Sequence, residues 1–177
     1  MLKRGAPLER RVLDADGWAP FAASFAALSR AVQDKAGFRH YPFREAYWPS
    51  LLEAAPGQTW AHGWFLDGRP VSFSFYVRDG DRLEAHSVGV DYDINREYEL
   101  YQNLLYDSVV TGIDVGARTV SYGRTALEMK SNLGAKPQPL RCWARHSGPL
   151  RNRLIRPLFH YLKPSRWTPR DPWKTSG

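Results

Sequence analysis

The stretch SYGRTALEMKSNLGA, residues 121–135, says most about the fold of this chain. It begins at the end of RTVSYG, a short run typical of a β-strand. The next residues, from about Thr125 to Leu133, predict a helix that stops at Gly134, because glycine commonly follows the last helical turn. A strand that leads into a helix predicts a parallel neighbour, since parallel strands are joined by crossover helices.

Upstream of this stretch, residues 58–91 predict three antiparallel strands. The runs TWAHGWFL, PVSFSFYV and RLEAHSVGV are rich in β-branched and aromatic residues, and the Asp67-Gly68 and Asp79-Gly80 pairs between them are hairpin turn sequences. Residues 97–115 return to helical spacing and stop at Gly116. The side chains of this helix that we expect to face the core are Leu100, Leu104, Leu105, Val109 and Ile113.

The two ends of the chain complete the order of elements. Residues 8–13, LERRVL, predict a short first strand, and Asp16 is the expected N-cap of an amphipathic helix that ends near Gly37. A second helix is predicted over Arg44–Ala55. After Gly134, PLRCWARH predicts another strand, and LRNRLIRPLFHYL predicts an amphipathic helix interrupted at Pro157.

This order, in a chain of 177 residues with net charge +7, predicts an α/β fold with a mixed central sheet: an antiparallel meander, then parallel strands with crossover helices. We expect a single domain at 1–149 and a basic helical arm at 150–177. From residue 141 onward, nine Lys and Arg stand against one acidic residue. A nucleic acid, an anionic membrane surface or a phosphate-bearing substrate is therefore a candidate partner for the arm alone.

Composition and missing sequence motifs reduce the number of protein classes to which this chain can belong. The N-terminus lacks the apolar run of a secretory signal and no stretch is long enough to span a bilayer, so we expect a cytoplasmic protein, with peripheral membrane attachment as the alternative. No Cys and His spacing predicts a metal site, and Cys142 is interpreted as a structural residue rather than a nucleophile. Walker, GxGxxG, HExxH and nucleophile-elbow motifs do not occur.

With these elements in place, the sequence resembles the GNAT superfamily of acyltransferases. The resemblance is closest to its Fem-like branch, which includes peptidoglycan aminoacyl transferases and cellulose-biosynthesis-like acetyltransferases. It runs from Ser87 to about Pro164: a helix such as YELYQNLLYDSVVTGIDVG, a strand ending Tyr-Gly, a helix with Lys-Ser, then Leu-Gly-Ala and a proline-flanked strand. The resemblance implies an N-acyltransferase that moves an acetyl or aminoacyl group from an activated donor to an amine by direct attack.

Lys130 is a catalytic candidate that this resemblance implies. In ordinary GNAT enzymes the helix after the fifth strand has Ala, then Tyr four residues on and Gly eight residues on. Ala126 and Gly134 keep that spacing here, and Lys130 stands at the tyrosine position. A lysine cation near a developing oxyanion or a phosphate would stabilise the negative charge. The alternative is a solvated helix residue.

The resemblance also implies acetyl-CoA or another acyl donor, although the usual pyrophosphate cradle is absent. Members that bind acetyl-CoA place glycines before a helix so that bare backbone N–H groups hold the pyrophosphate. Here DYDINREYELYQNLL puts Glu99 and Tyr101 on the glycine positions, where a side chain obstructs the approach and a carboxylate repels phosphate. Arg96 or Arg124 could contact phosphate instead.

Other candidates come from the third strand of the meander and from the elements that follow it. His86 and Glu84 share a face of that strand and could deprotonate an amine, directly or through water; ordinary polar strand positions are the alternative. A cofactor-binding wall is expected where the next helix begins and the next strand ends, with packing as the alternative for its tyrosines. Its members are Asn95, Tyr98, Tyr101, Tyr122 and Arg124.

The acceptor is expected to be a small-molecule amine or the amine of a cell-envelope precursor. Residues 150–177 could lie on an anionic membrane or hold the phosphates of tRNA, and packing of their apolar side on the domain is the alternative. Fem-type enzymes contain two such domains, so a homo-oligomer is a further expectation. A second functional class stays open: a non-catalytic binding or assembly module that retains the fold.

Overall fold

The computed structural model describes residues 7–36, 43–123, 126–141, 143, 145–149, 151–153, 168 and 172. The chain divides into two compact units, Met1–Thr125 and Ala126–Gly177, and each is described by itself. Most of the predicted basic arm, including the expected helix with Pro157, lies outside the described residues, so that expectation and the 149/150 boundary stay predictions. Within the described part, no helix is long and apolar enough to cross a bilayer.

The first unit is built on one mixed five-stranded sheet in the order β1-β2-β3-β4-β5. Its strands are β1 (Glu9–Leu13), β2 (Thr59–Leu66), β3 (Arg69–Asp79), β4 (Arg82–Val90) and β5 (Thr119–Ser121). The first four strands pair antiparallel, and β5 pairs parallel to β4. Asp67, Gly68 and Gly80 adopt positive φ at the two hairpin turns, as such tight connections require. The predicted meander followed by a parallel strand is confirmed.

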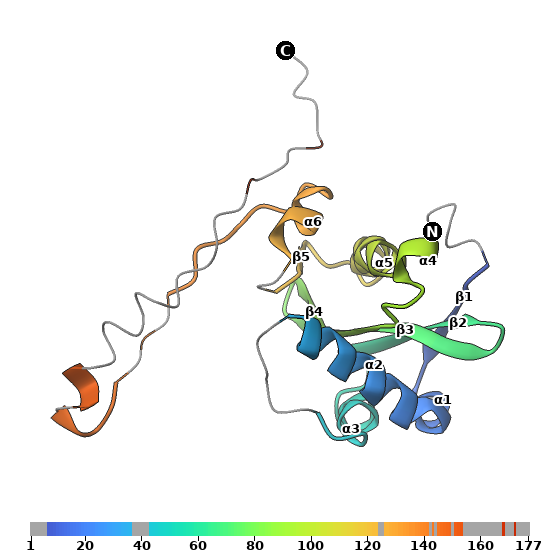
Figure 1. Cartoon of the computed structure of the whole chain (residues 1–177), viewed down its shortest axis with the longest axis horizontal. Helices are drawn as coiled ribbons and strands as arrows, with labels where there is room; N and C mark the ends of the chain where they lie inside the picture. The colour runs from blue at the N-terminus through green and yellow to red at the C-terminus, as the bar shows by residue number, and fades with distance from the viewer. Residues whose placement is uncertain are drawn as a thin grey trace, which may run out of the picture. The chain divides into compact units, whose positions relative to one another are not determined.

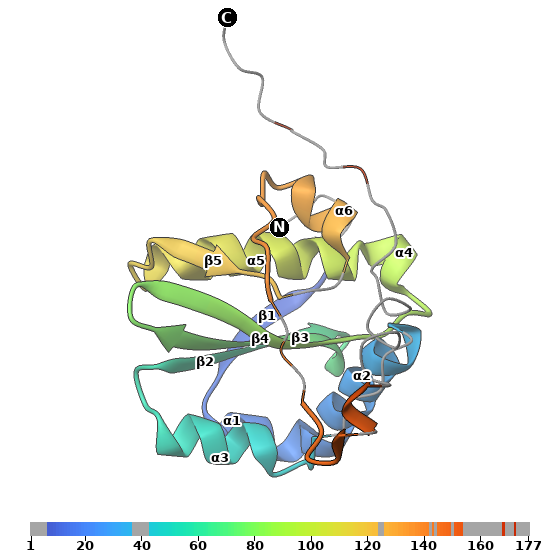
Figure 2. The same ribbon diagram turned by 90° about the vertical axis from the view of Figure 1, so that its left-hand side faces the viewer.

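Helices cover both faces of this sheet (Figures 1 and 2). One face carries α1 (Ala15–Trp18), the 3-10 turn η2 (Ala19–Phe21), α2 (Ala22–Lys35) and α3 (Tyr47–Ala54). The other carries α4 (Asn95–Tyr98) and α5 (Leu100–Asp114). The predicted N-cap at Asp16 is wrong by two positions, because the Asp14 carboxylate accepts the bond from the Gly17 N–H. Pro20 lies in η2, which separates the first helical turn from α2.

The core on the α1–α3 side of the sheet is aromatic. Trp18 is fully buried, with its ring 4.3 Å from that of Phe25 and 5.1 Å from that of Phe73 in an edge-on arrangement. Trp48 of α3 and Phe75 of β3 belong to the same cluster. Large rings in edge-on and tilted contact remove much apolar surface from water and limit how the helices can sit. The two N-terminal helical segments are therefore firmly attached to the sheet.

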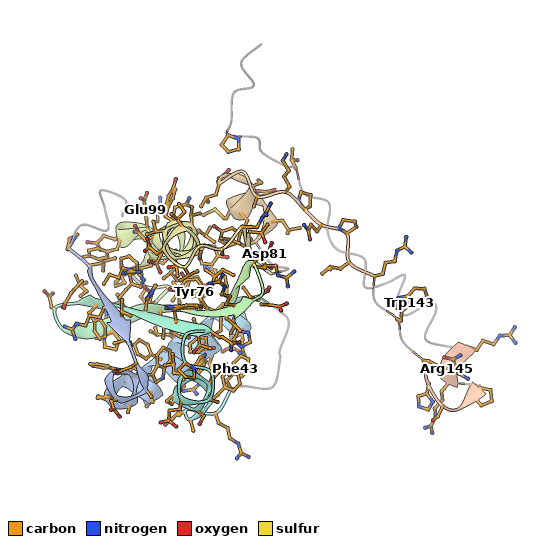
Figure 3. All side chains as sticks on the ribbon, turned by 180° about the vertical axis from the view of Figure 1, so that it is seen from behind. Phe43, Tyr76, Asp81, Glu99, Trp143 and Arg145 are labelled. Carbon is orange, nitrogen blue, oxygen red and sulfur yellow. The ribbon has the colours of Figure 1, made fainter. Side chains whose placement is uncertain are left out.

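The opposite face holds a buried polar cluster around Asp107 of α5. Its carboxylate accepts bonds from Arg10 Nε at 2.6 Å, Tyr76 Oη at 2.9 Å and Ser74 Oγ at 3.0 Å, and lies 2.7 Å from His62 Nδ1. Figure 3 shows Tyr76 between the sheet and α5. Burial acts to raise the pKa of Asp107, but the neighbouring His62, Arg10 and Tyr76 outweigh it and lower that pKa below its ordinary value of 3.8.

This polar cluster corrects the predicted inward face of α5. Leu100, Leu104 and Leu105 are buried as expected, but Val109 is 36% exposed and Ile113 is 72% exposed. Along the C-terminal half of α5, the side chains that face the sheet are polar, because the strands beneath present polar donors to Asp107. The buried stripe consists of Asn103, Asp107, Ser108 and Thr111.

The second unit begins with the short helix α6 (Leu127–Ser131). Ala126 before it and Gly134 after it both have positive φ, at +54° and +79°. The predicted strand PLRCWARH is wrong for its described residues, 139–141, 143, 145 and 146, which belong to no strand. Pro137 and Pro139 lack N–H donors, and no neighbouring strand supplies hydrogen bonds to the described part of this segment.

Asp107→Asn is expected to lower the free energy of unfolding by about 3 kcal/mol, because it leaves the Arg10 charge without its partner and turns an amide donor toward other donors. Urea unfolding followed by circular dichroism measures the change. The matched control is Asp81→Asn, which affects only an exposed 3.7 Å pair with Arg118 and should cost about 0.5 kcal/mol or less. Equal costs for the two variants would contradict the structural role of Asp107.

The same substitution should change how stability depends on pH. A carboxyl whose folded pKa is depressed contributes stability above its unfolded pKa and loses that contribution as pH falls through the folded value. For Asp107 the contribution is complete well above pH 3.8 and declines below it. The stability difference between the wild type and Asp107→Asn should therefore shrink as the pH is lowered from about 6 to about 3. A constant difference across that range would contradict the assignment.

Candidate active site

A β-bulge in β4 marks the first candidate site. Phe75 of β3 pairs with Ser87, and the next β3 residue, Tyr76, pairs with Ala85, so His86 has no partner across the ladder. The extra residue breaks the alternation of side chains. His86 and Ser87 consequently both face α3, where His86 Nε2 lies 2.7 Å from Tyr47 Oη and Ser87 Oγ accepts a 2.8 Å bond from Trp48 Nε1.

The sheet opens next to this bulge. The last pair between β4 and β5 is Glu84 with Ser121, and among the described residues no strand pairs with β4 on that side beyond it. From Ala85 onward, this edge of β4 pairs with no strand in the described part of the chain. Bulges commonly occur beside active sites because they redirect a side chain and end a pairing.

The predicted pair of His86 and Glu84 does share a face of β4. Desolvation lowers the pKa of His86, and the Glu84 carboxylate acts in the opposite direction with less effect. The imidazole is therefore mainly neutral near pH 7, as a general base must be. Glu84 itself accepts a 2.9 Å bond from Arg82, which holds its carboxylate on this surface.

Two aromatic residues of this surface were not predicted as site residues. Phe43 stacks on Tyr47 with ring centroids 4.4 Å apart and 17° between the ring planes, and it lies 6.1 Å from the His86 ring. Figure 3 shows Phe43 beside α3. Phe43 lies before the first residue of α3, so helical spacing gave no signal for its contact with Tyr47 or for its contact with His86.

The predicted pyrophosphate position lies at the junction of α4 and α5. Glu99 adopts φ +52° and ψ +40°, the left-handed conformation that glycine favours, so this residue occupies a glycine-like backbone position. Asn95 Oδ1 accepts a 2.8 Å bond from the Tyr101 N–H. Asn103 Nδ2 donates to the carbonyls of Tyr98 and Glu99. Two asparagine side chains thus hydrogen-bond to the backbone of this junction.

This arrangement does not fit a cradle of bare amides for the pyrophosphate of CoA. One amide of the first turn of α5 is already bound to Asn95, and Glu99 adds a carboxylate where the phosphates would approach. A helix N-terminus attracts anions only while its N–H groups are available and the local charge is not negative. Asn95 therefore acts here as a cap for α5.

The remaining predicted wall residues have different surroundings. Arg96 is exposed, and the hydroxyl of Tyr98 interacts with Glu97, which raises the pKa of Tyr98. Tyr122, just after β5, donates a 3.1 Å bond to the Leu105 carbonyl of α5, and burial raises its pKa to about 12. That hydroxyl attaches β5 to α5. Arg124 lies outside the described residues.

Lys130 belongs to the second unit, in α6. Lys130 is buried, with 6% of the residue exposed, and burial lowers its pKa to about 8. This excludes the solvated helix residue that the sequence left as the alternative. Within the described part of the chain, no three His, Cys, Asp or Glu side chains gather as a metal site would require.

Glu99→Gly is expected to raise the free energy of unfolding by up to about 1 kcal/mol, because glycine adopts the left-handed conformation without a steric cost. Glu97→Gly is the matched control in the right-handed turn of α4, where glycine should cost about 1 kcal/mol instead. Chemical denaturation of the two variants measures both changes. The strain assigned to Glu99 would be refuted by destabilisation of similar size in both.

Solved structures similar to this chain include acetyltransferases. One is a possible acetyltransferase from Clostridium difficile 630, with 14% identity, TM-score 0.56, and coverage of 78% of this chain and 97% of that chain. Another is an aminoglycoside acetyltransferase from an uncultured soil metagenomic sample in complex with sisomicin, at 12% identity, TM-score 0.57, and coverage of 80% and 98%. At these identities the likeness shows the fold.

A third structure is a ribosomal-protein-alanine N-acetyltransferase from Brucella melitensis biovar Abortus 2308, at 15% identity, TM-score 0.52, and coverage of 80% of this chain and 99% of that one. No curated protein matches the chain. The family described as acetyltransferase (GNAT) domain matches residues 2–131, which include the whole described sheet, the bulge at His86 and the helix with Lys130. The chain therefore belongs to the acetyltransferase (GNAT) domain family, a family of acyltransferase enzymes.

Proposed function

We propose that this domain is an N-acyltransferase in which His86, with Glu84 beside it, serves as the base for an amine acceptor. The supporting observation is the bulge that leaves His86 without a partner in the β4 ladder, two residues after the last pair with β5. A neutral imidazole can accept a proton from an amine as the amine attacks an acyl carbonyl. Edge N–H groups of β4 can donate to the carbonyl oxygen as it gains negative charge.

GNAT acetyltransferases use acetyl-CoA. The Tyr101 N–H bound to Asn95 and the side chain of Glu99 at the α4–α5 junction argue against the usual hold on its pyrophosphate. We propose an activated acyl donor that reaches the open edge of β4 and is bound elsewhere by cations such as Arg96. Aminoacyl-tRNA, the donor that the Fem-like resemblance implies, is the second candidate and would use the basic residues after 141.

Isothermal titration with acetyl-CoA and, separately, with an aminoacyl-tRNA identifies the donor, and turnover is then measured over a panel of primary amines. His86→Gln is expected to lower kcat/KM by at least about 100-fold, since a positioned general base contributes about that much or more. Glu53→Gln, an exposed change on α3, is the control and should leave kcat/KM unchanged. If the chain neither binds nor turns over either donor, that result would favour the second candidate function, a non-catalytic binding or assembly module.

For Lys130 we propose electrostatic stabilisation of the donor or of the oxyanion, supported by its burial and by the pKa of about 8. Burial disfavours the charged form of a lysine, so close to its pKa the ammonium readily loses a proton. The cation is present below pH 8 and disappears above it. Turnover that needs this cation should therefore fall as the pH rises through about 8.

Lys130→Arg should keep part of the turnover and extend it above pH 9, because arginine stays protonated, whereas Lys130→Met should lose turnover at every pH. The measurement is kcat against pH from about 6 to 10. Lys136→Met, an exposed change in the same unit, is the control. Unchanged turnover in Lys130→Met would refute the role.

The acceptor and the assembly state are proposals that rest on the sequence. A small-molecule amine is one candidate acceptor for a neutral imidazole on an exposed strand edge. The Fem-like resemblance adds a second candidate, the amine of a cell-envelope precursor. With a cell-envelope acceptor, the basic residues after 141 would bind an anionic membrane or tRNA. A second copy of the chain would supply the second domain that Fem-type enzymes contain.

A further inference from the structure

Two consecutive residues of β4 are bound to two consecutive residues of α3. His86 Nε2 lies 2.7 Å from Tyr47 Oη, and Ser87 Oγ accepts a 2.8 Å bond from Trp48 Nε1. Neighbours in a regular strand point to opposite faces, so only the bulge allows both contacts. Trp48 is fully buried and acts as the anchor, while Tyr47 is only partly buried.

We propose that Tyr47 is a catalytic residue of this site and that its hydroxyl, rather than the imidazole of His86, takes the proton from the amine. This deepens the proposed function, on which it rests. When the Tyr47 hydroxyl donates to His86 Nε2, it occupies the lone pair of that nitrogen. An incoming amine then reaches the base through the tyrosine oxygen, whose remaining lone pairs are available to it.

The surroundings hold Tyr47 in this position. Phe43 stacks on its ring at 4.4 Å, and the Trp48–Ser87 bond fixes the helical turn that carries it. Charged groups near His86 include Glu84 of β4, which is paired with Arg82, and Phe75 of β3 adds a ring 6.1 Å from His86. Glu84 is thus placed to stabilise the imidazolium that the transfer produces.

The protonation states agree with a relay in this direction. Burial raises the pKa of Tyr47 and lowers that of His86, with Glu84 opposing the second change, so near pH 7 the hydroxyl keeps its proton and the imidazole is mainly neutral. A neutral imidazole can accept the phenol proton only while the phenol receives another, which requires both transfers to occur together.

The proton transfer balances as follows in the proposed step. The amine nitrogen forms a bond to the acyl carbonyl carbon of a thioester or ester donor, and its proton passes to Tyr47 Oη. The original hydroxyl proton of Tyr47 passes to His86 Nε2. The bond between the carbonyl carbon and the leaving sulfur or oxygen then breaks, the leaving group takes the electron pair, and solvent restores both protonation states.

Tyr47→Phe tests the relay, because it keeps the stacked ring and removes only the hydroxyl. We expect kcat/KM to fall by at least about 100-fold, as in His86→Gln, and the double variant to lose no more than either single one, since residues that act as a unit are not additive. Tyr106→Phe, on an exposed tyrosine of α5, is the matched control and should keep full activity. Unfolding curves confirm that all variants are folded.

Tyr47→Phe with wild-type kcat/KM, beside an inactive His86→Gln, would overturn the relay while leaving the proposed function intact. Full activity in both variants would overturn both proposals. A second readout needs no substrate: nitrogen NMR of His86 should find the proton on Nδ1, with Nε2 shifted on Tyr47→Phe. A proton on Nε2 would overturn the relay, because Tyr47 would then be the acceptor in that bond.

Discussion

The buried carboxylate of Asp107 is the interaction on which the layered structure depends. A carboxylate that is only 3% exposed can stay ionised only if donors surround it, and here the donors come from three strands: Arg10 of β1, His62 of β2 and Tyr76 of β3. These contacts determine where α5 lies over the sheet. The position of α5 in turn fixes β5, because the Leu105 carbonyl receives the Tyr122 hydroxyl and a Cβ at Gly112 would stand 2.6 Å from Val120.

The two faces of the sheet therefore serve different purposes. Aromatic packing of Trp18 and Trp48 holds the N-terminal helices, and this firm contact allows α3 to present Tyr47 to the bulge at His86. The polar face orients α5, and at the start of that helix Asn95 occupies the Tyr101 N–H, one of the amides that a phosphate cradle would use. His86 lies in the middle of β4, and the α4–α5 junction follows the C-terminal end of that strand.

Sequence patterns identified elements wherever local chemistry dominates. The hairpin glycines, the β-branched runs and the glycine after SYGRTALEMKSNL all predicted the correct local structure, because turn geometry and strand periodicity are properties of neighbouring residues. The left-handed backbone at Glu99 also agrees with its alignment to a glycine position. PLRCWARH was predicted wrongly in its described residues, since a strand forms only where another strand supplies its hydrogen bonds.

By itself, the sequence determined the order of elements as far as α6, the mixed sheet and the family membership that the spacing of Ala126 and Gly134 suggested. Only the tertiary structure decided that Asp107 points inward while Ile113 points to water, because that choice depends on polar residues more than thirty positions away in β2 and β3. It also decided that His86 meets Tyr47. A bulge shifts side chains by one register position, and no spacing in the sequence records that shift.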